Sequence, residues 1–344
     1  MEGKKLLFNN VSAGSASAKK QESIFTNILK TIGRFFSNNG IVIAFLALFL
    51  VLSIASEHFF SWTNFMNVAR AAVPIAIIAF GMVFVIGMAE IDLSVGPVMV
   101  LVSIFYADAV NHGWNIYLAM LMALAAGAAI GAINATLITK ARITPFIATL
   151  AIAQIAYGIN MVYSHGVPIY GLSYPEVQFV DQYKIFGSVP FSVILCIVVG
   201  IICAILMYRM KFGRYVLSIG SNTEAARLVG INVHAIKYKV YMLVGTLCGL
   251  ASVIITSKME AAVPDGMVGH ELNVIAATVL GGTSMTGGKA KIWGAFIGAL
   301  LMILVQNGIN LLNINTFWQK AVVGFIILIA VGIDTASTYR NRAK

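Results

Sequence analysis

Two short polar stretches interrupt long apolar sequence, and they hold the side chains most able to do chemistry. The first is Glu90-Ile-Asp-Leu-Ser-Val-Gly-Pro97, with two carboxylates between apolar runs. Carboxylates are costly in lipid, so Glu90 and Asp92 should face protein or water, where they would contact a solute or form a gate. Alternatively, Asp92 or Ser94 caps a helix that restarts after a break, and the stretch only stabilises the fold. The residue types leave both interpretations open.

The second stretch, residues 281–290, is rich in glycine and hydroxyl side chains and contains Lys289. A glycine-rich loop that ends in lysine can cradle phosphates, but the P-loop pattern needs glycine where Thr283 stands and Ser or Thr where Ala290 stands. The chain also lacks a nucleophile elbow and a kinase motif set. Its three cysteines and five histidines show no metal-ligand spacing. We therefore predict no catalytic residue, no metal and no cofactor on this chain.

Uncharged polar side chains are the remaining candidates for contact with a solute. Amides and hydroxyls can hydrogen-bond the hydroxyl groups of a small solute, and they can equally bond across helices. Buried runs of carboxylates, arginines or histidines suited to proton or sodium coupling are missing. The candidates for a pathway or gate are Asp92, Ser94, Asn134, Gln154, Asn160, Asn273, Thr283, Ser284 and Asn307.

A polar island at residues 220–232 separates two apolar runs. Ser221 followed by Glu224 is a capping-box pattern, and Gly230 is placed to end the helix in a left-handed turn. The helix between them has about two turns, too few to cross a bilayer. Its apolar face holds Ala225, Ala226, Leu228 and Val229, and its polar face holds Glu224 and Arg227. This is typical of a docking element for a soluble partner or of an ordinary surface helix.

The elements that position these residues are membrane helices. The chain is 59% hydrophobic and only 10% charged, and its mean hydropathy is +0.89, which excludes a soluble globular protein. We predict an all-α polytopic protein with about ten spans, broken near 90–97 and 281–290. Breaks in corresponding parts of two halves are typical of a transport pathway and of an internal repeat. The spans cover roughly 41–56, 71–89, 95–111, 116–139, 145–163, 191–209, 239–257, 272–288, 292–312 and 317–335.

The basic residues predict the orientation. The net charge is +10, but the charges collect at the ends of apolar runs, which indicates topology rather than nucleic-acid binding. Ten crossings from a cytoplasmic N-terminus place most Lys and Arg residues in the cytoplasm. The predicted organisation is a partly disordered cytoplasmic segment 1–40, a transmembrane domain 41–337 with a cytoplasmic loop 211–237, and a cytoplasmic tail 338–344.

These stretches together resemble a known family. The chain is similar, from about residue 60 to 337, to the sugar permeases of bacterial ABC importers, which include the ribose, galactose, arabinose and xylose permeases. Glu90 stands where a smaller or polar residue is more usual, and Pro97 follows the glycine. The stretches that carry the resemblance are Glu90-Ile-Asp-Leu-Ser-Val-Gly, Ile143-Thr-Pro-Phe-Ile-Ala-Thr-Leu, Phe212-Gly-Arg, Gly220-Ser-Asn-Thr-Glu-Ala-Ala-Arg-Leu-Val-Gly-Ile-Asn, Val279-Leu-Gly-Gly-Thr-Ser-Met-Thr-Gly-Gly-Lys and Asn307-Gly-Ile-Asn-Leu-Leu.

The resemblance implies partners and a location. The island would be the coupling helix that sits in a groove of a cytoplasmic ATPase subunit, which would hold the ATP and Mg²⁺. Two permease chains, expected as a homodimer, would line one pathway in the bacterial cytoplasmic (inner) membrane, and an external sugar-binding protein would deliver the solute. The coupling residues would be Ser221, Glu224, Ala225, Ala226, Arg227, Leu228 and Gly230.

Alternatives remain open at this point. The resemblance favours a small sugar, with a pentose such as ribose first, but inositol or an autoinducer sugar derivative fits the same mechanism. A stand-alone secondary transporter or channel would need a charged ion site, and only Glu90 and Asp92 offer one. A membrane enzyme would need a nucleophile, a metal cluster or an acid–base pair, and none stands out.

Overall fold

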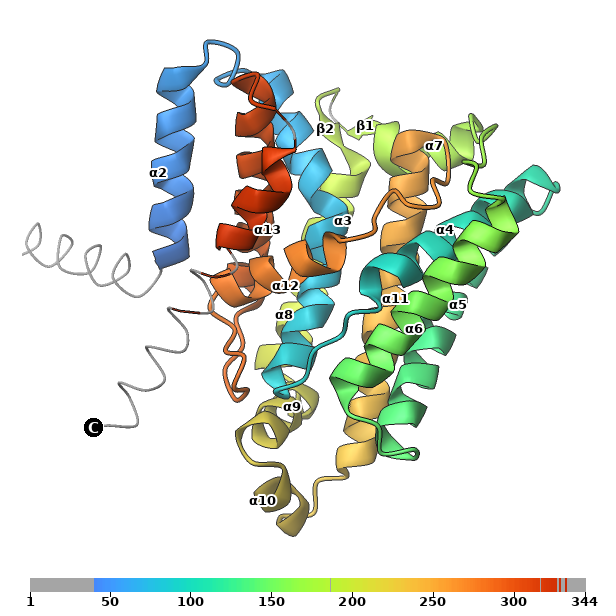
Figure 1. The fold of residues 1–344 in the computed structure, drawn as a ribbon, viewed down its shortest axis with the longest axis vertical. Helices are drawn as coiled ribbons and strands as arrows, with labels where there is room; N and C mark the ends of the chain where they lie inside the picture. The colour runs from blue at the N-terminus through green and yellow to red at the C-terminus, as the bar shows by residue number, and fades with distance from the viewer. Residues whose placement is uncertain (1–39, 186, 316, 327, 329–331, 333–344) are drawn as a thin grey trace, which may run out of the picture.

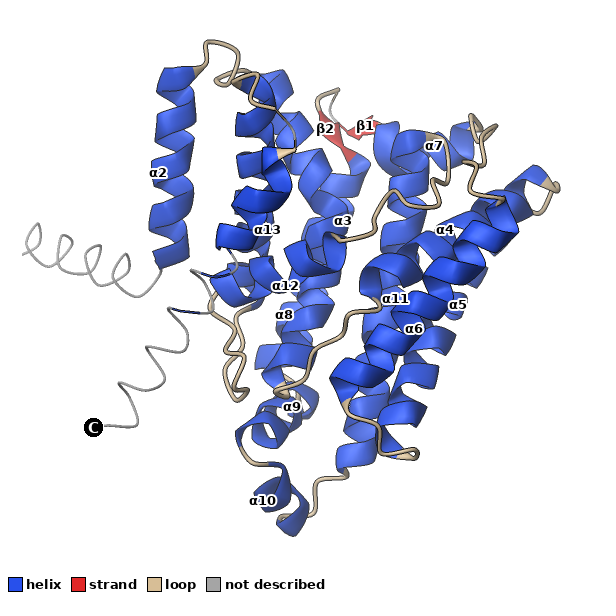
Figure 2. Cartoon of the chain, in the orientation of Figure 1, coloured by secondary structure: helices blue, strands red, loops and turns tan. Residues whose placement is uncertain are grey.

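The computed structural model describes residues 40–185, 187–315, 317–326, 328 and 332, and within these the chain is a bundle of helices with one two-stranded hairpin (Figures 1 and 2). The helices are α2 (Gly40–Ala55), α3 (Trp62–Gly87), α4 (Val95–Asn111), α5 (Ile116–Thr139), α6 (Pro145–Ser164), α7 (Pro175–Gln182), α8 (Phe191–Tyr208), α9 (Lys211–Ser221), α10 (Thr223–Leu228), α11 (Val233–Met259), α12 (His270–Leu280) and α13 (Ile292–Leu311). The strands β1 (Lys184–Ile185) and β2 (Val189–Pro190) pair antiparallel.

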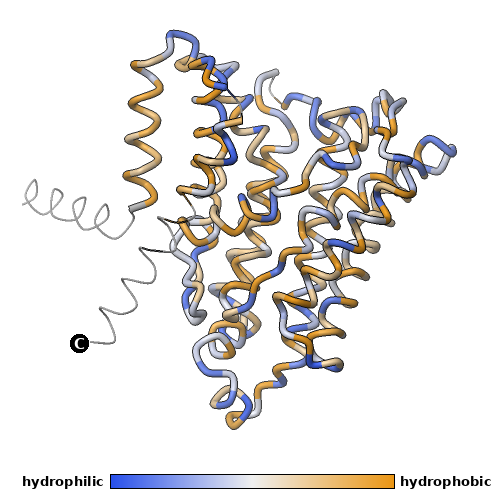
Figure 3. Tube along the Cα trace, viewed as in Figure 1, coloured by the Kyte–Doolittle hydropathy of each residue, from blue (hydrophilic) through white to orange (hydrophobic). Residues whose placement is uncertain are grey.

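Six of the described helices are long and apolar enough to cross a membrane: α3, α5, α6, α8, α11 and α13. Orange, apolar segments run along most of the bundle in Figure 3, whereas the blue, polar ones concentrate toward its two ends. The all-α membrane fold is therefore confirmed. The count of about ten spans stays a prediction, because segment 317–335 lies partly outside the described residues, of which 318–326 are helical. The terminal segments 1–39 and 338–344 also lie outside them.

Some predicted boundaries are wrong. The span expected at 272–288 is the short helix α12, which ends at Leu280 because Gly281 and Gly282 follow, and Gly282 has a left-handed φ of +90°. In contrast, α3 begins at Trp62 rather than at residue 71. Ser61 caps this earlier start, because its side chain accepts a hydrogen bond from the Asn64 amide.

Helix α3 lies at the centre of the bundle. Of the spanning helices it is the most buried, with 83% of its apolar window inside the structure, and α8, α11, α12 and α13 pack around it. Helices α5 and α11 approach so closely that a Cβ on Gly127 would collide with the Gly245 carbonyl, and one on Gly131 with the Tyr241 carbonyl. Glycines at this spacing let helix backbones touch, which fixes the α5–α11 pair as one unit.

Two short helices, α4 and α12, each follow a non-helical stretch. Residues 88–94 lead into α4, and residues 260–269 lead into α12 (Figure 1). The two N-terminal ends meet, because a Cβ on Gly96 would collide with the Glu271 carboxylate and lie 2.9 Å from the Met267 carbonyl oxygen. Two broken segments from opposite halves of the chain therefore come together inside the bundle, as in many transporters. Helix α12 is interrupted on both sides, by residues 260–269 before it and by the loop 281–291 after it. The break predicted at 281–290 is therefore only the second of these two non-helical stretches.

Candidate functional site

The first break is held in place by hydrogen bonds from its own residues and from α5. The buried Asp92 carboxylate accepts from the Ser94 amide at 2.8 Å and from the Ser94 hydroxyl at 2.6 Å. Asn134 Nδ2 of α5 donates to the Ser94 hydroxyl at 2.9 Å. Three of the predicted pathway residues are therefore one cluster. The predicted cap is only partly right, since Ser94 occupies the N-cap of α4 but its side chain makes no capping bond.

Helix α6 supports the same stretch. The Thr149 hydroxyl accepts from the Leu93 amide at 3.1 Å, and Asn160 Nδ2 donates to the Pro97 carbonyl at 3.3 Å. Asn134 and Asn160 are both buried, and the amide oxygen of each has no hydrogen-bond partner among the described residues. A buried oxygen without a hydrogen-bond partner costs about 1–3 kcal/mol, so these two amide oxygens are the unsatisfied acceptors beside the first break.

Glu90 belongs to a separate contact. Its carboxylate forms an ion pair with Lys237 and accepts from the Tyr241 hydroxyl at 3.1 Å, both on α11. This contact spans 151 residues of sequence between Glu90 and Tyr241, and no local spacing pointed to it. Glu90 is therefore already paired, which argues against a free ion-coupling carboxylate at this position.

The other predicted pathway residues do not join the cluster. Asn273 is buried on α12, and Thr283 accepts from the Lys291 amide at 3.2 Å within the loop 281–291. The Ser284 hydroxyl contacts that of Thr286 at 3.0 Å. Asn307 exchanges two amide hydrogen bonds with Asn64 between α3 and α13, at 2.8 and 3.3 Å. Gln154 is exposed on α6.

The polar island folds as a short helix, but its cap differs from the predicted one. Asn222, not Ser221, is the N-cap of α10, and its Oδ1 accepts from the Ala225 amide at 3.0 Å. Ser221 is the last residue of α9 and donates to the Leu217 carbonyl. Both residue types cap well, so the sequence alone did not separate them. Gly230, with φ +84°, ends the segment as predicted.

The predicted apolar face of α10 is divided. Ala226 is buried against the bundle, whereas Leu228 and Val229 are 89% and 76% exposed at the tip. Arg227 donates to Glu224 at 2.7 Å on the exposed polar face. Two large apolar side chains are therefore exposed at the tip of a segment too short to span a membrane.

The end of α9 is joined to two other segments by glycines. Gly288 donates its amide to the Gly87 carbonyl at 3.0 Å, and a Cβ on Gly220 would collide with that carbonyl and meet the Gly288 nitrogen at 2.9 Å. A Cβ on Gly287 would meet the Gly220 carbonyl at 2.6 Å. Gly87, Gly220, Gly287 and Gly288 are here named the glycine junction. It connects α9 and α10 to the end of α3 and to the loop after α12, and therefore to both broken segments.

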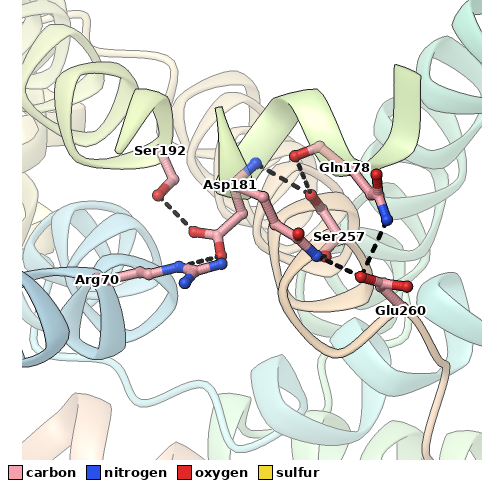
Figure 4. Close-up of polar contacts among 7 residues, drawn as sticks. Arg70, Gln178, Asp181, Ser192, Ser257 and Glu260 are labelled. Carbon is pink, nitrogen blue, oxygen red and sulfur yellow. Dashed lines mark hydrogen bonds and ion pairs between the residues drawn. The ribbon is translucent and has the colours of Figure 1, made fainter. Parts of the chain in front are cut away.

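The opposite end of the bundle is held by charged side chains (Figure 4). The fully buried Asp181 of α7 accepts from Arg70 Nε of α3 and from the Ser192 hydroxyl of α8, each at 2.5 Å. The Asp181 amide donates to the Ser257 hydroxyl of α11 at 3.0 Å. With Glu260 these residues are named the outer polar network, because the distribution of basic residues predicts that this end lies outside the cytoplasm. Sequence reasoning missed the network because 111 residues separate Arg70 from Asp181.

Glu260, just after α11, extends this network. The Ser173 hydroxyl donates to its carboxylate, as do Gln182 Nε2 at 2.6 Å and Gln178 Nε2 at 3.1 Å. These bonds favour the ionised carboxylate and hold the pKa of Glu260 below its usual value. The network therefore ties the loop before α7, α7 itself and the end of α11 into one unit.

Metal and thiol chemistry finds no support in the described part of the chain. No group of three or more His, Cys, Asp or Glu residues there is arranged to hold a metal ion. Cys196, Cys203 and Cys248 are buried and unpaired, which is typical of structural thiols inside helices.

Comparison with known proteins identifies a family match and close relatives. Residues 64–331 match the family described as branched-chain amino acid transport system / permease component. The chain is 38% identical over 301 residues to the ribose import permease protein RbsC of Escherichia coli K12, covering 85% of this chain and 92% of that protein. It is 39% identical to RbsC of Bacillus subtilis, covering 84% and 91%, and 34% identical to the L-arabinose ABC transporter permease protein AraH of Azospirillum brasilense, covering 89% and 90%. No solved structure matches.

Proposed function

Because this chain belongs to the branched-chain amino acid transport system / permease component family, within which it is a sugar ABC importer permease, we propose that its cargo is a pentose, with ribose first. The observation that carries this proposal is the similarity over nearly the whole chain to ribose import permeases of both Escherichia coli and Bacillus subtilis. The buried amide oxygens of Asn134 and Asn160 beside the first break support a route for an uncharged polyhydroxyl solute.

Uptake into vesicles tests the cargo. The chain is reconstituted with its ATPase subunit and its external binding protein, and labelled ribose is supplied with unlabelled arabinose, allose or myo-inositol as competitors. We expect unlabelled ribose to compete and the others to compete weakly. Strong uptake of another sugar, of inositol or of an autoinducer sugar derivative, with no uptake of ribose, would overturn the assignment of ribose and leave the importer class intact.

The energy for transport enters, in this proposal, through α10. Leu228 and Val229 would sit in a groove of the cytoplasmic ATPase subunit, which binds the ATP and Mg²⁺ and carries out the hydrolysis, so this chain itself is not an enzyme. The glycine junction supports this, because a displacement of α9 and α10 would reach the end of α3 and the loop after α12 through backbone contacts. The pathway would then switch between two states that contact the ATPase differently.

Co-purification of the ATPase subunit tests this contact. Val229→Asp places a charge at the exposed tip, and we expect it to remove the ATPase from the purified complex without lowering the unfolding temperature of the chain. Val268→Asp is the matched control, because Val268 is also exposed but lies before α12, away from α10. Full retention of the ATPase by Val229→Asp would contradict the coupling role.

A second permease chain and an external sugar-binding protein complete the proposed assembly. Gln154 lies on an exposed face of α6, and an amide facing lipid is unfavourable, which supports a second copy of the chain against this face. The binding protein would dock at the end that carries the outer polar network. The assembly would lie in the bacterial cytoplasmic membrane, with both termini in the cytoplasm.

A further inference from the structure

A cavity of about 920 Å³ lies beside α10, at the end of the bundle opposite the outer polar network. Three segments that are distant in sequence line it: the connection between α5 and α6, the end of α10, and the first turns of α11. The polar lining residues used below are Lys140, Arg142, Thr144, Arg227, His234 and Lys237. The exposed tip residues Leu228 and Val229 do not line the cavity, and it meets the first break only through Lys237, which pairs with Glu90.

The charges around this cavity do not balance. Four of its lining residues are permanent cations, and none of its lining residues is acidic. Arg227 is paired with Glu224 and Lys237 with Glu90. Lys140 and Arg142 have neither an ion pair nor a side-chain hydrogen bond with any described residue. Because two cations of the lining have no acidic partner, the cavity is a site of positive potential.

Arg142 lies in the turn that connects α5 to α6. Its φ is +56°, in the left-handed region that side chains other than Asn, Asp and His rarely adopt. Two backbone hydrogen bonds hold this turn: the Ala141 amide donates to the Thr136 carbonyl, and the Ile143 amide donates to the Leu137 carbonyl. Arg142 is thus the left-handed residue of the turn that ends α5, and it is one of the residues that line the cavity.

The membrane rule for basic residues does not explain the arrangement. That rule requires only that Lys and Arg lie on the cytoplasmic side of a span. It does not require basic residues from three separate segments to line one cavity.

We propose that this cavity binds a phosphate-bearing anion. Lys140, Arg142 and Arg227 would contact the phosphate oxygens, since guanidinium groups match phosphate geometry with paired hydrogen bonds. The Thr144 side chain makes no capping bond at the start of α6, so the amides of that first turn add to the positive potential. The source of the phosphate is a lipid headgroup or a soluble phosphorylated solute. The exposed Phe146 and Ile147 beside the cavity provide a surface for acyl chains.

Native mass spectrometry of the purified full chain in a neutral detergent tests the proposal. Phosphatidylglycerol and phosphatidylcholine are titrated in parallel, and inorganic phosphate is added in a separate series read by the unfolding temperature. The test variant combines Lys140→Gln with Arg142→Gln, which lack partners in the structure. The matched control combines Lys211→Gln with Arg214→Gln, two exposed cations of α9 outside the cavity.

We expect the unmodified chain to prefer phosphatidylglycerol. Each basic side chain should contribute about fivefold to the affinity for phosphatidylglycerol. The cavity variant, which loses two of them, should therefore bind this lipid about 25-fold more weakly at low salt, and the control variant should bind it nearly as well as the unmodified chain. If inorganic phosphate raises the unfolding temperature of the unmodified chain and not of the cavity variant, without any lipid preference, the source is a soluble phosphate. Equal weakening in both variants, or no response to either probe, would overturn the proposal. Neither result bears on the sugar cargo or on ATPase binding.

Discussion

The two ends of α3 are held by opposite means. At one end, Arg70 of α3 donates a hydrogen bond to the buried Asp181. This bond joins two opposite charges and depends on direction. At the other end, Gly87 contacts Gly220 and Gly288 through backbone atoms alone. A charged network fixes its partners to one geometry, whereas closely packed backbones pass on a displacement because nothing lies between them. We therefore propose that the end of α3 at Arg70 is an anchor and that the end at Gly87 carries movement from α10.

The largest effect on stability should come from breaking the anchor. Asp181→Asn leaves Arg70 without its charged partner in the network, and we expect a loss of about 3 kcal/mol in the free energy of unfolding. This value is at the lower end of the range for buried ion pairs, because the Arg70 side chain is partly exposed to solvent. The measurement is denaturant unfolding in detergent. Glu176→Gln on the same helix is the control, because Glu176 is exposed. A loss of less than about 1 kcal/mol for Asp181→Asn, within the usual range for exposed ion pairs, would mean that the pair is not an anchor.

A smaller effect is expected at the glycine junction. Gly220→Ala forces the end of α9 away from Gly87, and we expect a loss of about 1–3 kcal/mol in the free energy of unfolding. The same change should uncouple ATP hydrolysis from uptake, because the end of α9 no longer meets the Gly87 carbonyl of α3 backbone to backbone. Gly324→Ala is the matched control, since a Cβ there meets no atom within 4 Å among the described residues. Normal coupling in Gly220→Ala would remove the junction from the transmission route.

The smallest effect concerns the acid sensitivity of the outer polar network. The pKa of Glu260 is lowered in the folded chain, so its contribution to stability is complete above the unfolded value, 4.5, and is lost as the pH falls through the folded value. The fall in unfolding temperature between neutral and acidic pH should therefore be smaller in Glu260→Gln than in the unmodified chain. Asp265→Asn, in the exposed loop that follows, serves as the control. An unchanged acid response in Glu260→Gln would show that these bonds do not stabilise the folded chain.

The sequence predicted features set by a few neighbouring residues. Gly230 ends the segment after α10, Pro145 begins α6, and the first break lies where polar residues interrupt the apolar run. Local rules failed where two residues qualified equally, as with Ser221 and Asn222, and where the predicted span 272–288 was extended past Leu280 into a stretch of glycine and hydroxyl residues.

Contacts between distant residues were beyond sequence reasoning. Asp92, Ser94 and Asn134 were candidates by residue type, but their assembly depends on how α5 packs against the break, 40 residues away in sequence from Ser94. The pairs Arg70–Asp181 and Lys237–Glu90 join segments with no shared spacing, so each residue alone resembled a topology or loop charge. The glycine junction is likewise visible only when three segments are placed together.

Accumulation of sugar in vesicles tests most directly whether a partner drives this chain through α10. Labelled ribose is measured inside vesicles that contain the chain alone, under a proton or sodium gradient, and inside vesicles that also contain the ATPase subunit and the external binding protein with ATP. Accumulation is expected only in the second set, and Val229→Asp should abolish it. Accumulation against a gradient by the chain alone would contradict an importer powered from outside this subunit.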